Sequence, residues 1–149
     1  MRDILFRGKR VELDLWEESQ WIEGSLLELD ADSGYVYIMK PFHSASTLPP
    51  SAIISHNLSI VHPESVGQYT GLTDISGKRI FEGDIVEIHV GDLLKVGIVF
   101  YGAQAGRYGV SIRGEDNYSF MQQHLVKNYA IRVIGNKFDD REILLGGDG

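Results

Sequence analysis

Three carboxylates that lie close together in the chain are the first candidates for acid–base chemistry. They are Glu82, Asp84 and Glu87. Two carboxyl groups that face one another can act as general acid and general base. These three surround Gly83 in a stretch with the composition of a tight turn, where charged side chains normally face solvent. We therefore interpret them as solvated turn residues and expect no catalytic role.

Histidines are the next candidates, as metal ligands or proton carriers. The chain has five, and these are His43, His56, His62, His89 and His124. No two of them have the close spacing of a zinc-binding helix. The chain has no cysteine, which excludes disulfides, thiolate catalysis and cysteine-based zinc sites. We expect neither a metal nor another cofactor.

Two short motifs resemble ligand-binding loops but do not fit them. Asp30, Asp32 and Gly34 have the look of the start of a calcium loop, but the glycine is one position early and Pro41 replaces the final glutamate. The segment from Gly102 to Gly106 is rich in glycine but has no Lys-Ser/Thr pair after it. The nucleophile motifs of serine hydrolases and β-lactamases are absent. These observations predict that the protein is not an enzyme.

Composition narrows the class of protein further. The chain has 149 residues, of which 43% are hydrophobic, and this is enough to bury a core. Its formal net charge of −7 disfavours binding to a phosphate backbone unless the cations gather on one face. The first residues lack the apolar core of a signal peptide, and no stretch approaches a membrane span. We expect a cytoplasmic protein with no membrane partner.

The N-terminal third reads as antiparallel strands. Residues 21–29 and 35–39 are rich in β-formers, and the polar stretch between them predicts a hairpin loop. Residues 40–51 carry three prolines among small polar residues and predict a loop. Residues 53–61 predict a further strand.

The C-terminal part alternates between apolar and other residues with the period of two that is typical of half-buried strands. Val86, Ile88 and Val90 share one face, and Gly91-Asp92 predicts the turn that leads into the next strand. That strand has Leu94, Val96, Ile98 and Phe100 on one face and Lys95, Gly97, Val99 and Tyr101 on the other. A third strand carries Tyr108, Val110 and Ile112, residues 119–126 predict one or two helical turns, and residues 129–134 predict a closing strand. Short strands with little helix predict a small closed barrel.

One long phrase carries a family resemblance. It contains Gln68-Tyr69-Thr70-Gly71-Leu72, then Asp74, Gly77-Lys78 and Glu82-Gly83-Asp84-Ile85-Val86. This phrase closely resembles the signature of the YopX-like family, and further matches extend over nearly the whole chain. The resemblance implies a bacterial host, a phage or prophage gene and a C-terminal barrel of SH3-like type, and it implies no activity. We therefore predict a mostly β protein, with an N-terminal antiparallel β region in residues 1–63 and an SH3-like barrel in residues 64–149.

Most of this signature has a structural explanation, because glycines permit the tight turns that it requires. Gln68 and Tyr69 are the members that we single out as candidates for a binding role. Tyrosines and arginines near the predicted loops complete the candidate surface, since small barrels bind partners through loops with aromatic anchors. These residues are Tyr101, Arg107, Tyr108, Arg113 and Tyr118. For each tyrosine, packing in the core or at its rim is the competing interpretation.

Three functions remain open from the sequence. The first is a non-catalytic adapter that binds an unidentified protein. The second is nucleic-acid binding, which requires that the cations converge on one face; they are Lys78, Arg79, Lys95, Arg107 and Arg113. The third is a structural homo-oligomer that forms by pairing of exposed strand edges.

Overall fold

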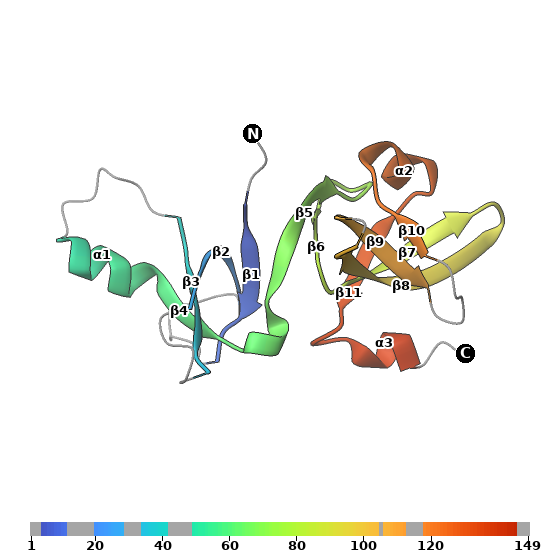
Figure 1. Cartoon of the computed structure of the whole chain (residues 1–149). Coiled ribbons are helices and arrows are strands. Elements are labelled where there is room, and N and C mark those ends of the chain that lie inside the picture. The colour runs from blue at the N-terminus through green and yellow to red at the C-terminus, as the bar shows by residue number, and fades with distance from the viewer. Residues whose placement is uncertain are drawn as a thin grey trace. The chain divides into compact units, whose positions relative to one another are not determined.

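The computed structural model describes residues 4–11, 20–28, 34–41, 49–104, 106–112 and 118–145 (Figure 1). The chain divides into two compact units, Met1–Gln68 and Tyr69–Gly149. The strands are β1 (Phe6–Lys9), β2 (Trp21–Leu27), β3 (Val36–Met39), β4 (Leu58–Val61), β5 (Gly67–Thr73), β6 (Arg79–Phe81), β7 (Asp84–Val90), β8 (Leu93–Gly102), β9 (Arg107–Ile112), β10 (Tyr118–Phe120) and β11 (Arg132–Asn136). The helices are α1 (Pro50–Asn57), the 3-10 turn η1 (Pro63–Ser65), α2 (Gln123–Asn128) and α3 (Arg141–Leu145). All strand pairs are antiparallel, and the prediction of a mostly β fold is confirmed.

Strand pairing in the first unit closes into a ring. β1 pairs with β2, β2 with β3, and β3 with β4. Beyond the end of β1, Arg10 forms a bridge with Val61 at the end of β4. Backbone hydrogen bonds flank that bridge on both sides, from Val11 to Ile60 and from His62 to Lys9. Ring closure leaves few backbone groups of these short strands exposed to solvent.

A glycine allows the ring to turn its sharpest corner. β2 pairs with β1 through Gly24 and with β3 from Ser25 onward, so the strand changes partners at this point. A Cβ atom on Gly24 would lie 2.0 Å from the carbonyl oxygen of Met39, a distance that no side chain can tolerate. Glycine in a strand often marks such a close approach of two backbones at a barrel corner.

The core of the first unit is small. Ile22, Ile38 and Val61 are almost fully buried, and Phe6, Leu26, Val36 and Val66 pack around them. Arg10 is also buried, and its Nε donates a hydrogen bond of 3.2 Å to Ser59 Oγ. The predicted hairpin between residues 21–29 and 35–39 is confirmed as the β2–β3 pair.

The predicted strand over residues 53–61 is wrong in its first half. Residues 50–57 form helix α1, and only Leu58–Val61 are extended, as strand β4. Pro50 stands at the start of the helix, where proline is favoured because its missing N–H would have no partner there. Of the predicted loop over residues 40–51, the stretch 42–48 lies outside the described residues.

The second unit contains a five-stranded sheet in the order β10-β9-β8-β7-β11. β7 to β10 follow one another as a meander, and β11 returns to pair with β7. Within the same unit, residues 69–73 of β5 pair with β6. The turn at Gly91 and the β7–β8 hairpin are confirmed, with Gly91 at a φ of 61°.

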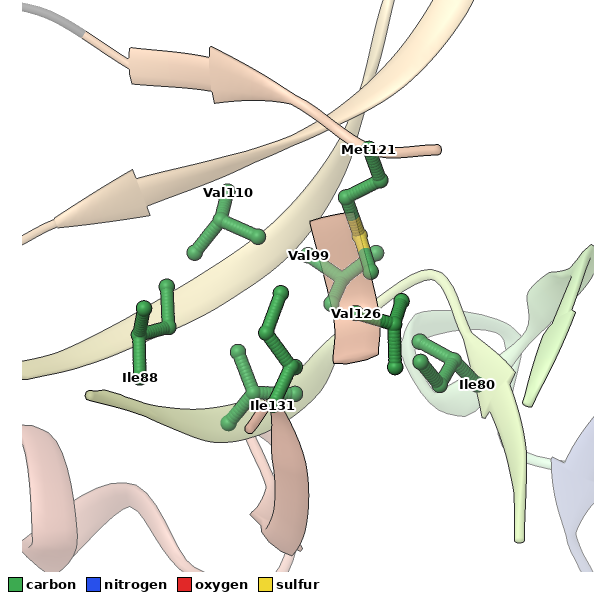
Figure 2. Close-up of a cluster of buried hydrophobic side chains, with 8 residues drawn as sticks. Ile80, Ile88, Val99, Val110, Met121, Val126 and Ile131 are labelled. Atoms are coloured by element: carbon green, nitrogen blue, oxygen red, sulfur yellow. The ribbon is translucent and has the colours of Figure 1, made fainter. Parts of the chain in front are cut away.

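Side chains from the sheet and from the segments that cover it form the core of this unit (Figure 2). The buried members are Ile80, Val86, Ile88, Val99, Val110, Met121, Val126 and Ile131. Val126 comes from α2, so the helix predicted within residues 119–126 is confirmed in its second half, whereas residues 119 and 120 belong to strand β10. The predicted closing strand is confirmed as β11, with slightly later bounds.

The apolar face that we predicted for β8 is wrong. The structure buries Gly97 and Val99, and it leaves Leu94 57% exposed. Gly97 faces the core because β9 lies very close to it: a Cβ atom there would be 2.5 Å from Val110 Cγ1. Because glycine has no side chain, Gly97 does not mark its face as apolar in the sequence. The pattern of apolar residues therefore indicated the face of Leu94, Val96, Ile98 and Phe100 instead.

Candidate functional site

The family-like phrase forms the β5–β6 hairpin and the turn into β7. Thr70 is buried, and its hydroxyl donates a hydrogen bond of 2.7 Å to the Ile80 carbonyl and accepts one of 3.1 Å from the Leu72 N–H. The register of the β5–β6 pair shifts between Tyr69 and Thr73. Gly71 lies in this irregular stretch with a φ of 86°, which favours glycine. These members of the signature therefore shape a bulged strand.

Asp74 organises the turn that follows. Its Oδ1 accepts hydrogen bonds from the Ser76 N–H, the Ser76 hydroxyl and the Lys78 N–H, at 2.9, 2.7 and 2.9 Å. Its Oδ2 accepts a bond of 3.0 Å from the Val133 N–H at the start of β11. Burial raises the pKa of Asp74, but the hydrogen bonds, led by the one from Val133, outweigh burial and hold the pKa below its ordinary value of 3.8. The carboxylate is therefore a structural group held in its charged form.

Asp84 corrects the prediction of solvated turn carboxylates. Its exposed fraction is 0%, and its Oδ2 accepts a hydrogen bond of 2.7 Å from the Phe81 N–H. The preceding Gly83 has a φ of 91°, and its backbone bonds to Val99 and Lys137 on the two neighbouring segments. Asp84 therefore closes the β6–β7 turn from inside the fold. Its neighbours Glu82 and Glu87 are partly exposed.

Gln68 and Tyr69 lie on β5. The Cα atom of Gln68 lies opposite that of Phe6 in the β1–β5 pair, and the side chain of Gln68 is half-buried. The Tyr69 ring packs against the Phe81 ring with 5.6 Å between centroids. The Arg79 guanidinium lies 5.8 Å from the centre of the Tyr69 ring, within the range of a cation–π contact.

Tyr101, Arg107 and Tyr108 all lie at the end of the β8–β9 hairpin. Tyr101 and Tyr108 are directly opposite one another, and Gly102 is opposite Arg107. The two tyrosine rings pack with 5.1 Å between centroids at an interplanar angle of 60°. Tyr101 is 46% exposed, whereas Tyr108 is only 7% exposed. Tyr101 therefore presents an aromatic group to solvent, supported by the Tyr108 ring on the same face. Arg107 is also exposed, but it is adjacent to Tyr108 in the strand and so projects from the other face of the hairpin.

The other two residues of the predicted surface are not part of this cluster. Arg113 lies outside the described residues. Tyr118 is the first residue of β10, opposite Ser111 on β9.

The β7–β8 turn carries a second group of exposed side chains, all apolar, which the sequence analysis did not single out. Val90, Leu93 and Leu94 are 38%, 62% and 57% exposed there. The alternation placed Val90 and Leu94 on apolar faces of their strands, which hid their exposure. One feature of the sequence did indicate this exposed group. Leu93 and Leu94 are two consecutive apolar residues directly after the Gly-Asp turn, so one of them has to face away from the core.

Within the ranges that the structure describes, no group of three or more His, Cys, Asp or Glu side chains could hold a metal ion. The Asp30–Gly34 motif falls almost entirely outside those ranges. No helix among the described residues has the length and apolar character that a membrane crossing requires.

Comparison with known proteins shows which family and which fold the chain resembles. No curated protein matches it. The crystal structure of protein EF1440 from Enterococcus faecalis is similar in fold, with a TM-score of 0.55 and 22% sequence identity. That match covers 97% of this chain and 99% of the other. A family profile described as "YopX protein" matches residues 16–145, and the chain therefore belongs to the YopX family.

Proposed function

We propose that this protein is a non-catalytic adapter that binds another protein in the cytoplasm of a bacterium that carries a phage or prophage. The observation that supports this proposal is the exposure of two side chains at the end of the β8–β9 hairpin, Tyr101 on one face and Arg107 on the other. Tyrosine and arginine are enriched among the residues that dominate binding energy at protein interfaces. Tyr108 holds the Tyr101 ring at 5.1 Å, so binding would cost little side-chain entropy.

The strand order supports the finer proposal that the second unit is an SH3-like barrel. A meander of four strands is followed by the short helix α2, and β11 then returns to the first strand of the meander. Barrels of this kind carry many unrelated functions, so the function has to be argued from the exposed residues.

Nucleic-acid binding receives less support from the positions of the cations. Lys95 lies opposite Ile88, whereas Arg107 lies opposite Gly102 near the other end of β8. At about 3.4 Å per residue, seven residues along β8 separate these positions by roughly 24 Å. With a net charge of −7, cations that are spread in this way disfavour a phosphate backbone.

The test is a tagged pull-down from an induced host lysate, with and without nuclease, followed by mass spectrometry. We expect a stoichiometric protein partner that survives nuclease and is lost when Tyr101 and Arg107 are both changed to alanine. Tyr35→Ala, which removes a tyrosine that is 56% exposed in the first unit, is the matched control. Partners that disappear with nuclease would favour nucleic-acid binding, and recovery of the bait alone would favour a homo-oligomer.

A further inference from the structure

As far as the structure describes the sheet, the β7–β8 hairpin extends beyond its neighbouring strands as a two-stranded ribbon. Among the described residues, β11 pairs with β7 only as far as Glu87, and β9 pairs with β8 only from Gly97 onward. Residues 88–90 therefore pair with residues 93–95, and neither stretch pairs with a further described strand. The hydrogen bond of 2.8 Å from the His89 N–H to the Tyr129 carbonyl fastens the base of the ribbon. In Figure 1 the yellow turn between β7 and β8 projects beyond the neighbouring strands.

The end of this ribbon, residues 90–94, is apolar on both faces; we call it the ribbon tip. Val90 lies directly opposite Leu93, so these two side chains share one face. Leu94 follows Leu93 along the strand and therefore projects from the other face, beside His89. All three apolar side chains are more than a third exposed. Ile88, only two residues before Val90, is 6% exposed and belongs to the core.

The amount of exposed apolar surface argues against contact between two copies through their tips. A Leu or Val side chain presents on the order of 100 Å² of apolar surface when fully exposed. With exposed fractions of 38%, 62% and 57%, the tip presents roughly 150 Å². Two tips in contact would bury about 300 Å², far below the ~1,200 Å² of the smallest stable interfaces. A tip of this size therefore adds to a larger contact and does not hold two proteins together by itself.

The shape of the tip indicates what it fits. A flat surface reaches one face of a ribbon, and would leave either Leu94 or the pair of Val90 and Leu93 in water. A groove reaches both faces together and also encloses the turn. The charge of the tip adds to this argument, because Asp92 at the apex is exposed and the whole chain carries a net charge of −7. Both features disfavour an anionic membrane surface and favour a groove with basic residues at its rim.

We propose that the ribbon tip inserts into an apolar groove with a basic rim on a different protein. This inference rests on the proposed function and deepens it, because it adds a second contact near the opposite end of β8 from Tyr101. An adapter with two separate contact sites on one rigid strand can hold a partner in a defined orientation.

The experiment places a photo-crosslinking benzoylphenylalanine in the full-length chain at position 93, at position 94, or at position 4. Ile4 is 73% exposed in the first unit and serves as the matched control. After illumination in host lysate, we expect the same protein to be crosslinked from positions 93 and 94 and not from position 4. Its crosslinked peptide should contain Lys or Arg. Benzoylphenylalanine is apolar like the leucine that it replaces, so the tip keeps its apolar character. The crosslinking result is therefore independent of whether the charged Leu→Asp variants fold.

The crosslinked protein is then purified, and its Kd is measured for variants of the chain. We expect Leu93→Asp and Leu94→Asp each to weaken binding at least tenfold, and Ile4→Asp to change the Kd by less than twofold. Because the two leucines are exposed, both variants should keep the melting temperature of the wild-type chain. An unchanged Kd in both leucine variants would overturn the inference.

Four other outcomes would also overturn the inference about the ribbon tip. Crosslinks to a second copy of the chain would overturn the inference in favour of a dimer. Cosedimentation with vesicles of phosphatidylcholine and phosphatidylglycerol that is lost in Leu94→Asp would overturn it in favour of a membrane. If the Kd responds to Tyr101→Ala with Arg107→Ala but not to the tip variants, the inference fails and the proposed function stands. If no protein is crosslinked or captured at all, both fail.

Discussion

The Asp74 carboxylate accepts a hydrogen bond of 3.0 Å from the backbone N–H of Val133, a residue 59 positions later in the chain. Its other oxygen organises the turn between β5 and β6. The Ile75 N–H adds a backbone bond of 3.1 Å to the Ile131 carbonyl beside it. One side chain therefore both shapes a local turn and joins that turn to the last strand of the sheet.

Replacement of Asp74 by alanine should strongly destabilise the second unit. Asp74 is 4% exposed, so its loss would leave several backbone N–H groups without an acceptor in a buried place. We expect the free energy of unfolding to fall by about 2–4 kcal/mol. Urea unfolding followed by circular dichroism measures this, with Asp92→Ala at the exposed β7–β8 turn as the control. A loss no larger than that of the control would show that the carboxylate is dispensable.

Acid should remove the contribution of Asp74. The pKa of Asp74 is lower in the folded chain than its ordinary value of 3.8, so the folded state favours the charged form. The stability that follows is fully present above the unfolded pKa and is lost as the pH falls through the folded one. Between pH 5 and pH 3, the urea midpoint of the wild-type chain should therefore fall more steeply than that of Asp74→Asn. Parallel curves would contradict this assignment.

Thr70 should tolerate serine but not valine. Valine preserves the shape but removes both hydrogen bonds of the hydroxyl, to Ile80 and from Leu72. Because Thr70 is buried, we expect Thr70→Val to cost about 1–2 kcal/mol and Thr70→Ser to retain most of the stability. Thermal unfolding of the two variants side by side provides the measurement. Equal losses would indicate that the methyl group matters more than the hydroxyl.

Gly97→Ala should destabilise the sheet through a specific clash. The new Cβ would lie 2.5 Å from Val110 Cγ1 and 2.8 Å from the Ser111 carbonyl oxygen. We expect a loss of about 1–3 kcal/mol. In a double-mutant cycle, Val110→Ala should partly relieve this loss, because it removes the side chain that clashes. The same cycle with Gly71→Ala should show no coupling, since no atom lies within 4 Å of a Cβ at Gly71.

The two tyrosines of the β8–β9 hairpin should differ sharply in stability. Tyr108 is only 7% exposed, so Tyr108→Ala leaves a cavity and should lower the free energy of unfolding by about 3–5 kcal/mol. Tyr101→Ala loses little more than the contact between the rings, worth about 0.5–1.5 kcal/mol. Chemical denaturation of both variants checks this. Similar losses would mean that Tyr101 is a structural residue and would weaken its assignment to a binding surface.

The sequence predicted local turns and hairpins well. Gly77, Gly83 and Gly91 all have positive φ angles at predicted turns, because turn chemistry is local and glycine reports it directly. The failure at Ile53 and Ile54 arose because a short apolar run does not distinguish a strand from a helix, and Pro50 was the signal that favoured the helix.

Features that depend on distant contacts could not be read from the sequence. Gly97 faces the core only because Val110 approaches it, and Asp84 is buried only because the β6–β7 turn folds inward. For the candidate site, the sequence pointed to Tyr101, Arg107 and Tyr108; the two tyrosines pack together, and Arg107 lies beside them on the other face of the hairpin. It did not separate the exposed Tyr101 from the buried Tyr108, since both occupy positions of high β-propensity and their exposure is set by the rest of the unit.

Ring closure in the first unit has a consequence for synthesis on the ribosome. β1 is made well before β4 and β5, yet Arg10 beyond its end needs Val61, and Phe6 needs Gln68. Translation proceeds at about 5–20 residues per second. β1 therefore waits on the order of several seconds for its last partners, and during that time it lacks part of its pairing. Nascent chains that are arrested with residue 61 still inside the exit tunnel should have unprotected amides in β1, and chains arrested well beyond residue 68 should not.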